Sequence, residues 1–174
     1  MDLFWERLGG RHDKASFESG TSELDFYLKN QAGQDIRRSL TSVFVLTQKS
    51  GRIIGYYTLS QASLTVNEFP DNISKKLPPK RSVPCTLLGR LALDQRYRGQ
   101  GYGRALLLHA LKKAALVSEE VAAYAVIVDA KDIQAKEFYL RHAFIELKNQ
   151  PLRLFIPLRG LREVIDLWNQ DTPS

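Results

Sequence analysis

The sequence contains a single cysteine, Cys85, among its 174 residues. One cysteine cannot form an internal disulfide framework, and no cysteine and histidine pattern has the spacing of a zinc site. No apolar run approaches the roughly 18 residues that cross a membrane, and the segment from Met1 to Arg7 lacks the apolar core of a secretory signal. We therefore expect a cytoplasmic protein without a bound metal.

Length and composition favour a single domain over residues 1–174. Apolar residues make up 44% of the chain, which is enough for a sizeable core. The net charge of +6 has the sign expected for a polyanionic partner. An anionic coenzyme or an ordinary basic surface would explain the same charge, so charge alone leaves nucleic-acid binding open.

The periodicity of apolar residues predicts alternating strands and helices. Ser22 and Asp25 form a capping-box-like start to a first helix, and Asp132 can cap a later one. The four prolines between residues 67 and 84 predict a mobile loop, and residues 149–151 predict a turn. We expect strands at 43–47, 53–60, 87–93, 123–129, 144–147 and 152–158. We expect helices at 23–28, 104–115, 133–142 and 161–168. This order favours a three-layer α/β/α fold with a mixed, mostly antiparallel sheet.

The most informative stretch runs from Arg96 to Arg104, where glycines alternate with arginines between a strand and an amphipathic helix. Unpaired amides at a helix N-terminus favour an anion, and glycine lets phosphate oxygens approach the main chain. The dinucleotide fingerprint would need glycine at position 104, and the Gly-Lys-Ser/Thr of the nucleotide P-loop is absent. The stretch predicts a pyrophosphate cradle, to which Arg98 and Arg104 could add charge-assisted bonds. The alternative is an ordinary glycine-rich turn.

The pattern R-x-x-G-x-G, read at Arg96, Gly99 and Gly101, resembles the acetyl-coenzyme A loop of the GCN5-related N-acetyltransferases (GNAT). The stretch from Ala135 to Phe144 resembles a second landmark of that family. The resemblance implies a GNAT fold, acetyl-CoA as cosubstrate and no metal. It places the coenzyme against Leu91, Ala92, Leu93, Arg98, Gly99, Gln100, Gly101, Tyr102, Gly103, Arg104 and Phe138.

The same resemblance implies that Tyr139 is the general acid that protonates the departing thiolate. A phenol with a reference pKa of about 10 is protonated at neutral pH and can give up its proton to a thiolate beside it. The strand from Arg90 to Leu93 would pair with the pantetheine amides, and an N–H near Leu93 would polarise the thioester carbonyl. The alternative for Tyr139, Leu91 and Leu93 is packing in the core.

The other nucleophile and base candidates are weak. No Ser-His-Asp or Cys-His constellation is evident, which favours direct attack by a substrate amine over an acyl-enzyme. Cys85 is interpreted as a packed small residue. His12, His109 and His142 have no convincing partner for base catalysis, and His109 and His142, which fall on predicted helices, are interpreted as surface or packing residues.

The amino-terminal half narrows the resemblance to the acetyltransferase toxins of bacterial toxin–antitoxin modules. The matching stretches are residues 8–13, 17–20, 23–28, 34–35, 55–60, 88–94, 135–139 and 151–155. Many relatives have cysteine where this chain has Ser19, a difference that affects packing rather than chemistry. The resemblance implies acetylation of the α-amine of aminoacyl-tRNA, a block of translation, a homodimer and a small ribbon-helix-helix antitoxin.

Phosphate contacts to the RNA would come from a basic, proline-rich segment and from the end of the first helical region. The candidates are Lys75, Lys76, Lys80, Arg81, Arg37 and Arg38. Two alternatives stay open: an acetyltransferase that acts on a small-molecule or protein amine, and a non-enzymatic binding module on the same fold.

Overall fold

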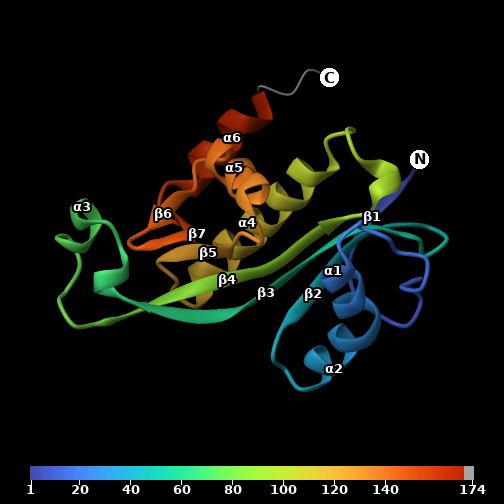
Figure 1. The fold of residues 1–174 in the computed structure, drawn as a ribbon, viewed down its shortest axis with the longest axis horizontal. Helices are drawn as coiled ribbons and strands as arrows, with labels where there is room; N and C mark the ends of the chain where they lie inside the picture. Colours follow the sequence, from blue (N-terminus) through green and yellow to red (C-terminus); the bar gives the residue numbers. More distant parts are fainter. Residues whose placement is uncertain (171–174) are drawn as a thin grey trace. The chain divides into compact units, whose positions relative to one another are not determined.

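The structure is a computed structural model that describes residues 1–170 (Figure 1). The chain forms two compact units, the first from residues 1–60 and 89–110 and the second from residues 61–88 and from 111 onward. Strands β3 (Ile53–Thr65) and β4 (Ser82–Leu93) and helix α4 (Tyr102–Glu120) each contribute to both units. Each unit is described by itself below, and the single domain over residues 1–174 stays a prediction.

The first unit contains the predicted hairpin. Strands β2 (Ser42–Gln48) and β3 are antiparallel, with Phe44 opposite Tyr57, and the hairpin prediction is confirmed. Strand β1 (Leu3–Arg7) pairs antiparallel with the other side of β2 and was not predicted. Phe4 and Trp5 are neighbours in this strand and both are exposed, so it lacks the clean alternation that marks a strand in sequence.

Helical turns cover one side of this unit's core. They are α1 (Ser22–Phe26), a π-helical turn (Tyr27–Gln31) and α2 (Ala32–Arg37), and Figure 1 shows them over β2. The predicted Ser22–Asp25 capping box is wrong, because the Asp25 carboxylate accepts a hydrogen bond from the Ser19 N–H at 2.9 Å. The helical turns and the strands share one buried core, which consists of Phe17, Tyr27, Leu28, Ala32, Val43, Val45, Ile53, Tyr56 and Ala92.

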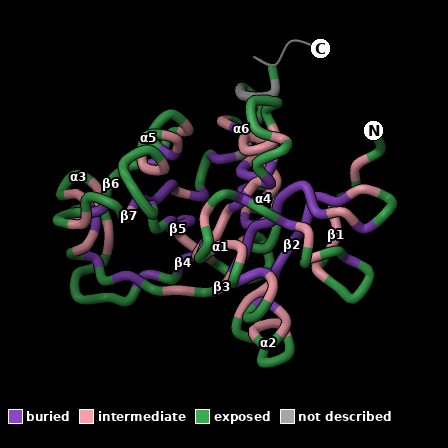
Figure 2. Tube along the Cα trace, turned by 45° about the vertical axis from the view of Figure 1, so that its right-hand side comes forward, coloured by how far each residue is buried: buried purple, intermediate pink, exposed green. Residues whose placement is uncertain are grey.

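The second unit contains the parallel strand pair. Strand β4 runs parallel to β5 (Ala125–Asp129), with Cys85 opposite Ala125, and β7 (Gln150–Pro157) pairs antiparallel with β5. Strand β6 (Ile145–Leu147) completes the unit on the far side of β7. Residues 125–128 are all buried, as Figure 2 shows for β5. Both faces of this strand are covered, which is why it reads as a continuous apolar run.

Two loop predictions need correction. Residues 67–84 contain most of a 3-10 turn (Val66–Glu68), helix α3 (Asp71–Ser74) and the start of β4, so Ser82 to Pro84 belong to a strand. Gln150 and Pro151 begin β7, and the turn before it passes through Asn149 at φ +59°. Proline is tolerated at the start of a strand, which is why Pro151 does not end it.

The helices and strands predicted for the rest of the second unit are confirmed. Helix α5 (Ile133–Arg141) begins after Asp132, whose carboxylate accepts from the Ala135 N–H at 2.8 Å. Helix α6 (Leu161–Gln170) lies where the last helix was expected. Across the strands the hydrogen-bonded order is β1-β2-β3-β4-β5-β7-β6, with β4 and β5 parallel, which confirms a mixed, mostly antiparallel sheet. Within residues 1–170 no helix is long and apolar enough to cross a membrane.

Candidate active site

The glycine loop lies in the first unit, between the end of β4 and the start of α4. Gly99 at φ +75° and Gly101 at φ +83° adopt the left-handed conformation that favours glycine. Apart from the adjoining backbone, no heavy atom of the described residues lies within 4 Å of the point that a Cβ would occupy at Gly99, Gly101 or Gly103. The main chain of the loop therefore borders open space, as the predicted pyrophosphate cradle requires.

Helix α4 begins directly behind the loop. The Ala105 N–H donates to the Gly101 carbonyl at 3.1 Å, which closes the first helical turn. The amides of Tyr102 and Gly103 precede that bond and have no acceptor within the helix. These amides and the positive end of the helix dipole favour an anion in front of the loop, and the binding of a pyrophosphate there stays a prediction.

The two arginines expected at the cradle differ in their surroundings. Arg98 is exposed, and its Nη2 donates to the Ser19 carbonyl, so part of its hydrogen-bonding capacity ties the loop to the amino-terminal segment. Arg104 is half-buried in the first turn of α4. Their contacts to a phosphate stay a prediction.

Asp94 fixes the base of the loop, and sequence reasoning assigned it no role. Its side chain is fully buried and accepts from the Arg96 Nε at 2.9 Å, the Arg96 Nη2 at 2.7 Å and the Glu18 N–H at 3.1 Å. Burial raises the pKa of Asp94, but the hydrogen bonds from Arg96 and Glu18 outweigh burial and hold that pKa below its usual value. The only signal in sequence is an aspartate two residues before the motif arginine.

This lowered pKa predicts acid sensitivity. A carboxylate whose pKa is lower in the folded than in the unfolded state stabilises the fold above its unfolded pKa, about 4, and loses that stabilisation as the pH falls through the folded pKa. We expect wild type to exceed Asp94→Asn in free energy of unfolding by about 1–3 kcal/mol at pH 7. Urea denaturation from pH 7 to pH 2.5 should show this difference shrinking in acid; a difference that stays constant would contradict the assignment.

Residues 91–93 of β4, which are expected beside the pantetheine arm, are packed against the rest of the first unit to different degrees. Ala92 is buried in the core, while Leu91 and Leu93 are half-buried. A Cβ on Gly55 would stand 2.9 Å from the Ala92 carbonyl oxygen and 2.6 Å from the Leu106 side chain. Glycine at position 55 therefore lets β3, β4 and α4 approach closely.

Tyr139 lies in α5, in the second unit. Its side chain is buried, 7% exposed, and its ring packs edge-on against Phe144 and Phe138, each with ring centroids 5.3 Å away. Burial raises the pKa of Tyr139 above its ordinary value, so the hydroxyl is protonated at neutral pH. The residue thus packs a core and also carries the proton that a general acid needs.

The structure gives the histidines structural partners that the sequence did not reveal, which agrees with the packing interpretation of His109 and His142. His12 is buried, its Nδ1 accepts from the Gly9 N–H at 2.9 Å, and its Nε2 lies 2.9 Å from a Glu6 carboxylate oxygen. His109 bonds the Tyr57 hydroxyl at 2.8 Å and stacks on Trp5. These contacts hold the first unit together.

In the second unit, His142 and Cys85 are also structural. The His142 Nδ1 donates to the Phe138 carbonyl at 2.8 Å, one turn back on α5. Cys85 is buried, and burial raises the pKa of its thiol to about 11. A thiol with that pKa is a poor nucleophile at neutral pH, which agrees with its interpretation as a packing residue.

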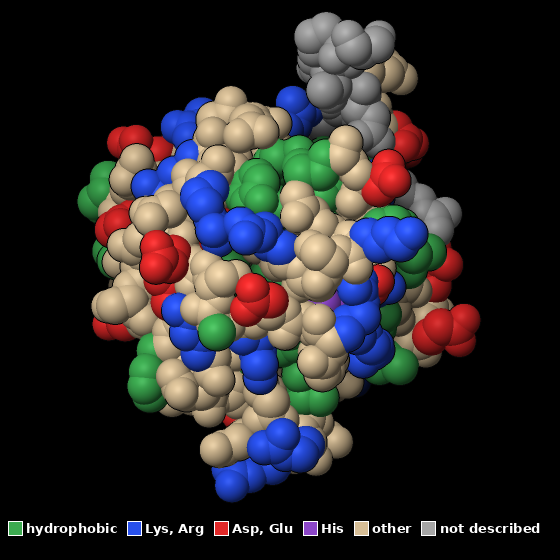
Figure 3. All heavy atoms as spheres, turned by 90° about the vertical axis from the view of Figure 1, so that its right-hand side faces the viewer, with side chains coloured by type: hydrophobic (Ala, Val, Ile, Leu, Met, Phe, Trp, Pro, Cys, Tyr) green, Lys and Arg blue, Asp and Glu red, His purple; other side chains and the backbone are tan. Residues whose placement is uncertain are grey.

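The basic segment between α3 and β4 is exposed. Lys75, Lys76, Lys80 and Arg81 lie in or beside it, and Arg37 and Arg38 lie at the end of α2. Figure 3 draws another face of the molecule, on which lysine and arginine side chains form several separate groups with acidic side chains between them. Within the second unit, Lys148 anchors α3 through a 2.8 Å ion pair with Asp71.

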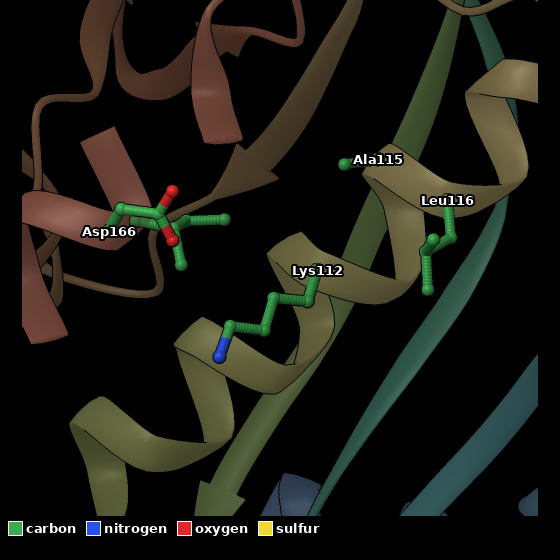
Figure 4. Close-up of a pocket in the computed structure, with 5 residues that line it drawn as sticks. Lys112, Ala115, Leu116 and Asp166 are labelled. Carbon is green, nitrogen blue, oxygen red and sulfur yellow. The ribbon is translucent and has the colours of Figure 1, made fainter. Parts of the chain in front are cut away.

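One hollow in the second unit was not predicted. It has a volume of about 250 Å³ and is lined by Lys112, Ala115 and Leu116 of α4 and by Ile165 and Asp166 of α6 (Figure 4). These lining residues include no serine, cysteine or histidine. No group of three or more His, Cys, Asp or Glu side chains that could hold a metal occurs in the part of the chain that the structure describes.

The chain belongs to the acetyltransferase (GNAT) family, whose sequence profile matches residues 4–144. It is an acetyl-CoA-dependent acetyltransferase with the GNAT fold, so the fold and the enzyme class predicted from sequence are confirmed.

Known relatives point to a particular branch of the family. A tRNA-acetylating toxin of Mycobacterium tuberculosis is 30% identical over 91% of this chain and 94% of its own length. The structure of AtaT complexed with acetyl-methionyl-tRNAfMet has a TM-score of 0.86 and 28% identity, covering 94% of this chain and 99% of AtaT. A tyrosine-to-phenylalanine mutant of the AtaT toxin, bound to the C-terminus of the antitoxin AtaR, has a TM-score of 0.79 and 25% identity, covering 99% and 100%. The chain is therefore related to tRNA-acetylating toxins of toxin–antitoxin systems.

Proposed function

We propose that this protein is a toxin that transfers acetyl from acetyl-CoA to the α-amine of the amino acid on a charged tRNA, and so blocks translation. The observation that carries the proposal is the similarity over nearly the whole chain to a tRNA-acetylating toxin. Similarity of this extent covers both units, including the amino-terminal stretches outside the coenzyme loop.

The glycine loop holds the coenzyme in this proposal. The helical amides behind Gly101 and the open space over the loop glycines support binding of a pyrophosphate there. Arg98 and Arg104 add positive charge, and Gln100, Tyr102 and Phe138 complete the contacts. Residues 91–93 of β4 offer backbone groups to the pantetheine amides. The coenzyme supplies an activated acetyl group as a thioester.

Tyr139 is the general acid in this proposal. A tyrosine hydroxyl is protonated at neutral pH even at its ordinary pKa of about 10, and in this proposal Tyr139 donates that proton to the coenzyme sulfur as the carbon–sulfur bond breaks. The new bond joins the acetyl carbon to the substrate nitrogen, which releases a proton to water, and Tyr139 then regains a proton from water. A backbone N–H near Leu93 stabilises the negative charge on the carbonyl oxygen.

The basic segment contributes the affinity for RNA in this proposal, together with Arg37 and Arg38. The logarithm of the association constant for tRNA falls linearly with the logarithm of the salt concentration, and each phosphate contact adds about one to the steepness of that line. We expect the double substitution Lys80→Ala and Arg81→Ala to make the line less steep by about 2. Filter binding to charged tRNA from 50 to 300 mM salt measures this slope. Lys49→Ala, which removes an exposed lysine in the β2–β3 turn, should leave it unchanged; an equal loss in both variants would contradict the assignment.

The remaining features of the proposal concern partners and location. The protein acts in the cytoplasm as a homodimer without a metal, and a small ribbon-helix-helix antitoxin neutralises it. The AtaT complex with the C-terminus of AtaR supports a protein antitoxin for this branch of the family.

Cell-free translation tests the function. Purified protein with acetyl-CoA should stop synthesis of a reporter, and the same protein without acetyl-CoA should not. Because a transferase for small or protein amines would leave charged tRNA intact, continued synthesis in the presence of both would refute the toxin and favour that alternative.

A further inference from the structure

The residues just before α1 are bonded to the base of the glycine loop, although about 80 positions separate them in sequence. We call residues Ser16 to Ser19 the strap. The Gln95 N–H donates to the Glu18 carbonyl at 2.8 Å, and the Glu18 N–H donates to Asp94 at 3.1 Å. Two arginines of the loop also donate to strap carbonyls, Arg96 to Ser16 at 2.8 Å and Arg98 to Ser19.

Asp94 organises these bonds from the centre. Its Oδ1 accepts from the Arg96 N–H at 3.0 Å and from Arg96 Nε, while its Oδ2 accepts from Arg96 Nη2 and from the strap. Because the carboxylate is fully buried and accepts four hydrogen bonds, replacing it leaves buried donors without their acceptor. The arrangement is therefore sensitive to this one side chain.

The side chain of Arg96 faces Asp94 and the strap. Its Nε and Nη2 form a two-pronged pair with the carboxylate, and Nη2 also donates to Ser16. This geometry orients the planar guanidinium toward the protein. The motif arginine thus makes its side-chain hydrogen bonds to Asp94 and to the strap, while 43% of the side chain is exposed.

Anchoring matters because the loop that follows is rich in glycine. Gly99 and Gly101 have more conformational freedom than other residues when the chain is not held, and ordering them on binding would weaken affinity. A loop fixed at its base by Asp94 and the strap has lost part of that freedom before the coenzyme arrives.

We propose that Asp94 and Arg96 are positioning residues for acetyl-CoA: together with the strap they hold the glycine loop in its binding geometry, and Arg96 is not a phosphate ligand. The inference rests on the proposed role of the loop as the pyrophosphate cradle. It predicts that substitutions of Asp94 and Arg96 weaken the affinity for acetyl-CoA and leave the rate of the chemical step unchanged.

The test measures steady-state kinetics and acetyl-CoA affinity by calorimetry for Asp94→Asn, Arg96→Lys and the double variant. We expect KM and Kd for acetyl-CoA to rise about 10-fold in each single variant, with kcat and the KM for charged tRNA within about twofold of wild type. Since both side chains act through one arrangement, the double variant should lose no more than the worse single one.

Circular dichroism and thermal melting separate this role from a purely structural one. A structural role lowers the melting temperature but leaves KM of the folded enzyme unchanged, and that outcome would overturn the inference. If Asp94→Asn does not fold, Arg96→Lys, which keeps the charge but loses the planar fork, gives the same readout. The matched control is Asp71→Asn, which breaks the exposed ion pair to Lys148 and should leave the KM for acetyl-CoA unchanged.

Two further outcomes are informative. Additive losses in the double variant would mean that Arg96 contacts phosphate by itself, which overturns the inference while leaving the cradle intact. Normal acetyl-CoA binding by a Gly101→Glu variant would overturn the cradle itself and the inference with it.

Discussion

Tyr139→Phe is expected to lower kcat about 100-fold or more while leaving the affinity for acetyl-CoA nearly unchanged. The substitution removes only the hydroxyl, and the ring contacts with Phe138 and Phe144 can persist. Loss of the proton donor leaves the departing thiolate to take its proton from water. Steady-state kinetics with charged tRNA and calorimetry with acetyl-CoA measure the two quantities.

Tyr124→Phe is the matched control for this substitution. Tyr124 also lies in the second unit, where its ring packs edge-on against Phe69 with centroids 5.5 Å apart. Its variant should keep kcat within about twofold of wild type, since no role in proton transfer is assigned to it. Equal activity of the Tyr139→Phe enzyme and wild type would remove Tyr139 from the mechanism.

Gly101→Glu is expected to weaken acetyl-CoA binding at least about 100-fold. The new side chain would start in the open space above the loop, and its carboxylate would repel a phosphate there. A non-glycine residue is also strained at φ +83°. Calorimetric titration with acetyl-CoA measures the loss directly.

Gly160→Glu is the control that distinguishes repulsion of the coenzyme phosphate from backbone strain as the cause of weaker binding in Gly101→Glu. Gly160 also has a positive φ, +78°, has open space at its Cβ position, and directly precedes a helix, α6. This variant carries the same strain and charge outside the loop and should bind acetyl-CoA as wild type does. Similar losses in both variants would attribute the effect to strain and contradict the cradle.

The features predicted correctly from sequence are encoded locally. The β2–β3 hairpin follows from two β-branched and aromatic runs around a polar connection, and the start of α5 follows from Asp132, three residues from the amide that it caps. The glycine loop was located for the same reason, because its spacing lies within nine residues. Local chemistry was also sufficient to identify Cys85 as a packing residue.

The features that were missed depend on partners far away in sequence. The bonds from Asp94 and Arg96 to the strap join residues 76 and 80 positions apart, and no local pattern reveals them. The Asp25 carboxylate accepts a hydrogen bond from the Ser19 N–H, because the chain turns back before α1. It therefore does not form the predicted capping box with Ser22. Proline signals also misled at Pro84 and Pro151, which are tolerated near the starts of β4 and β7.

The most direct test of the proposed function is mass spectrometry of charged tRNAs after incubation with the protein and acetyl-CoA. We expect a mass increase of one acetyl group on the α-amine of the amino acid of particular charged tRNAs, and none on the same tRNAs when uncharged. Unmodified aminoacyl ends in every charged tRNA, from a protein that binds acetyl-CoA, would contradict the toxin assignment and direct the search to small or protein amines.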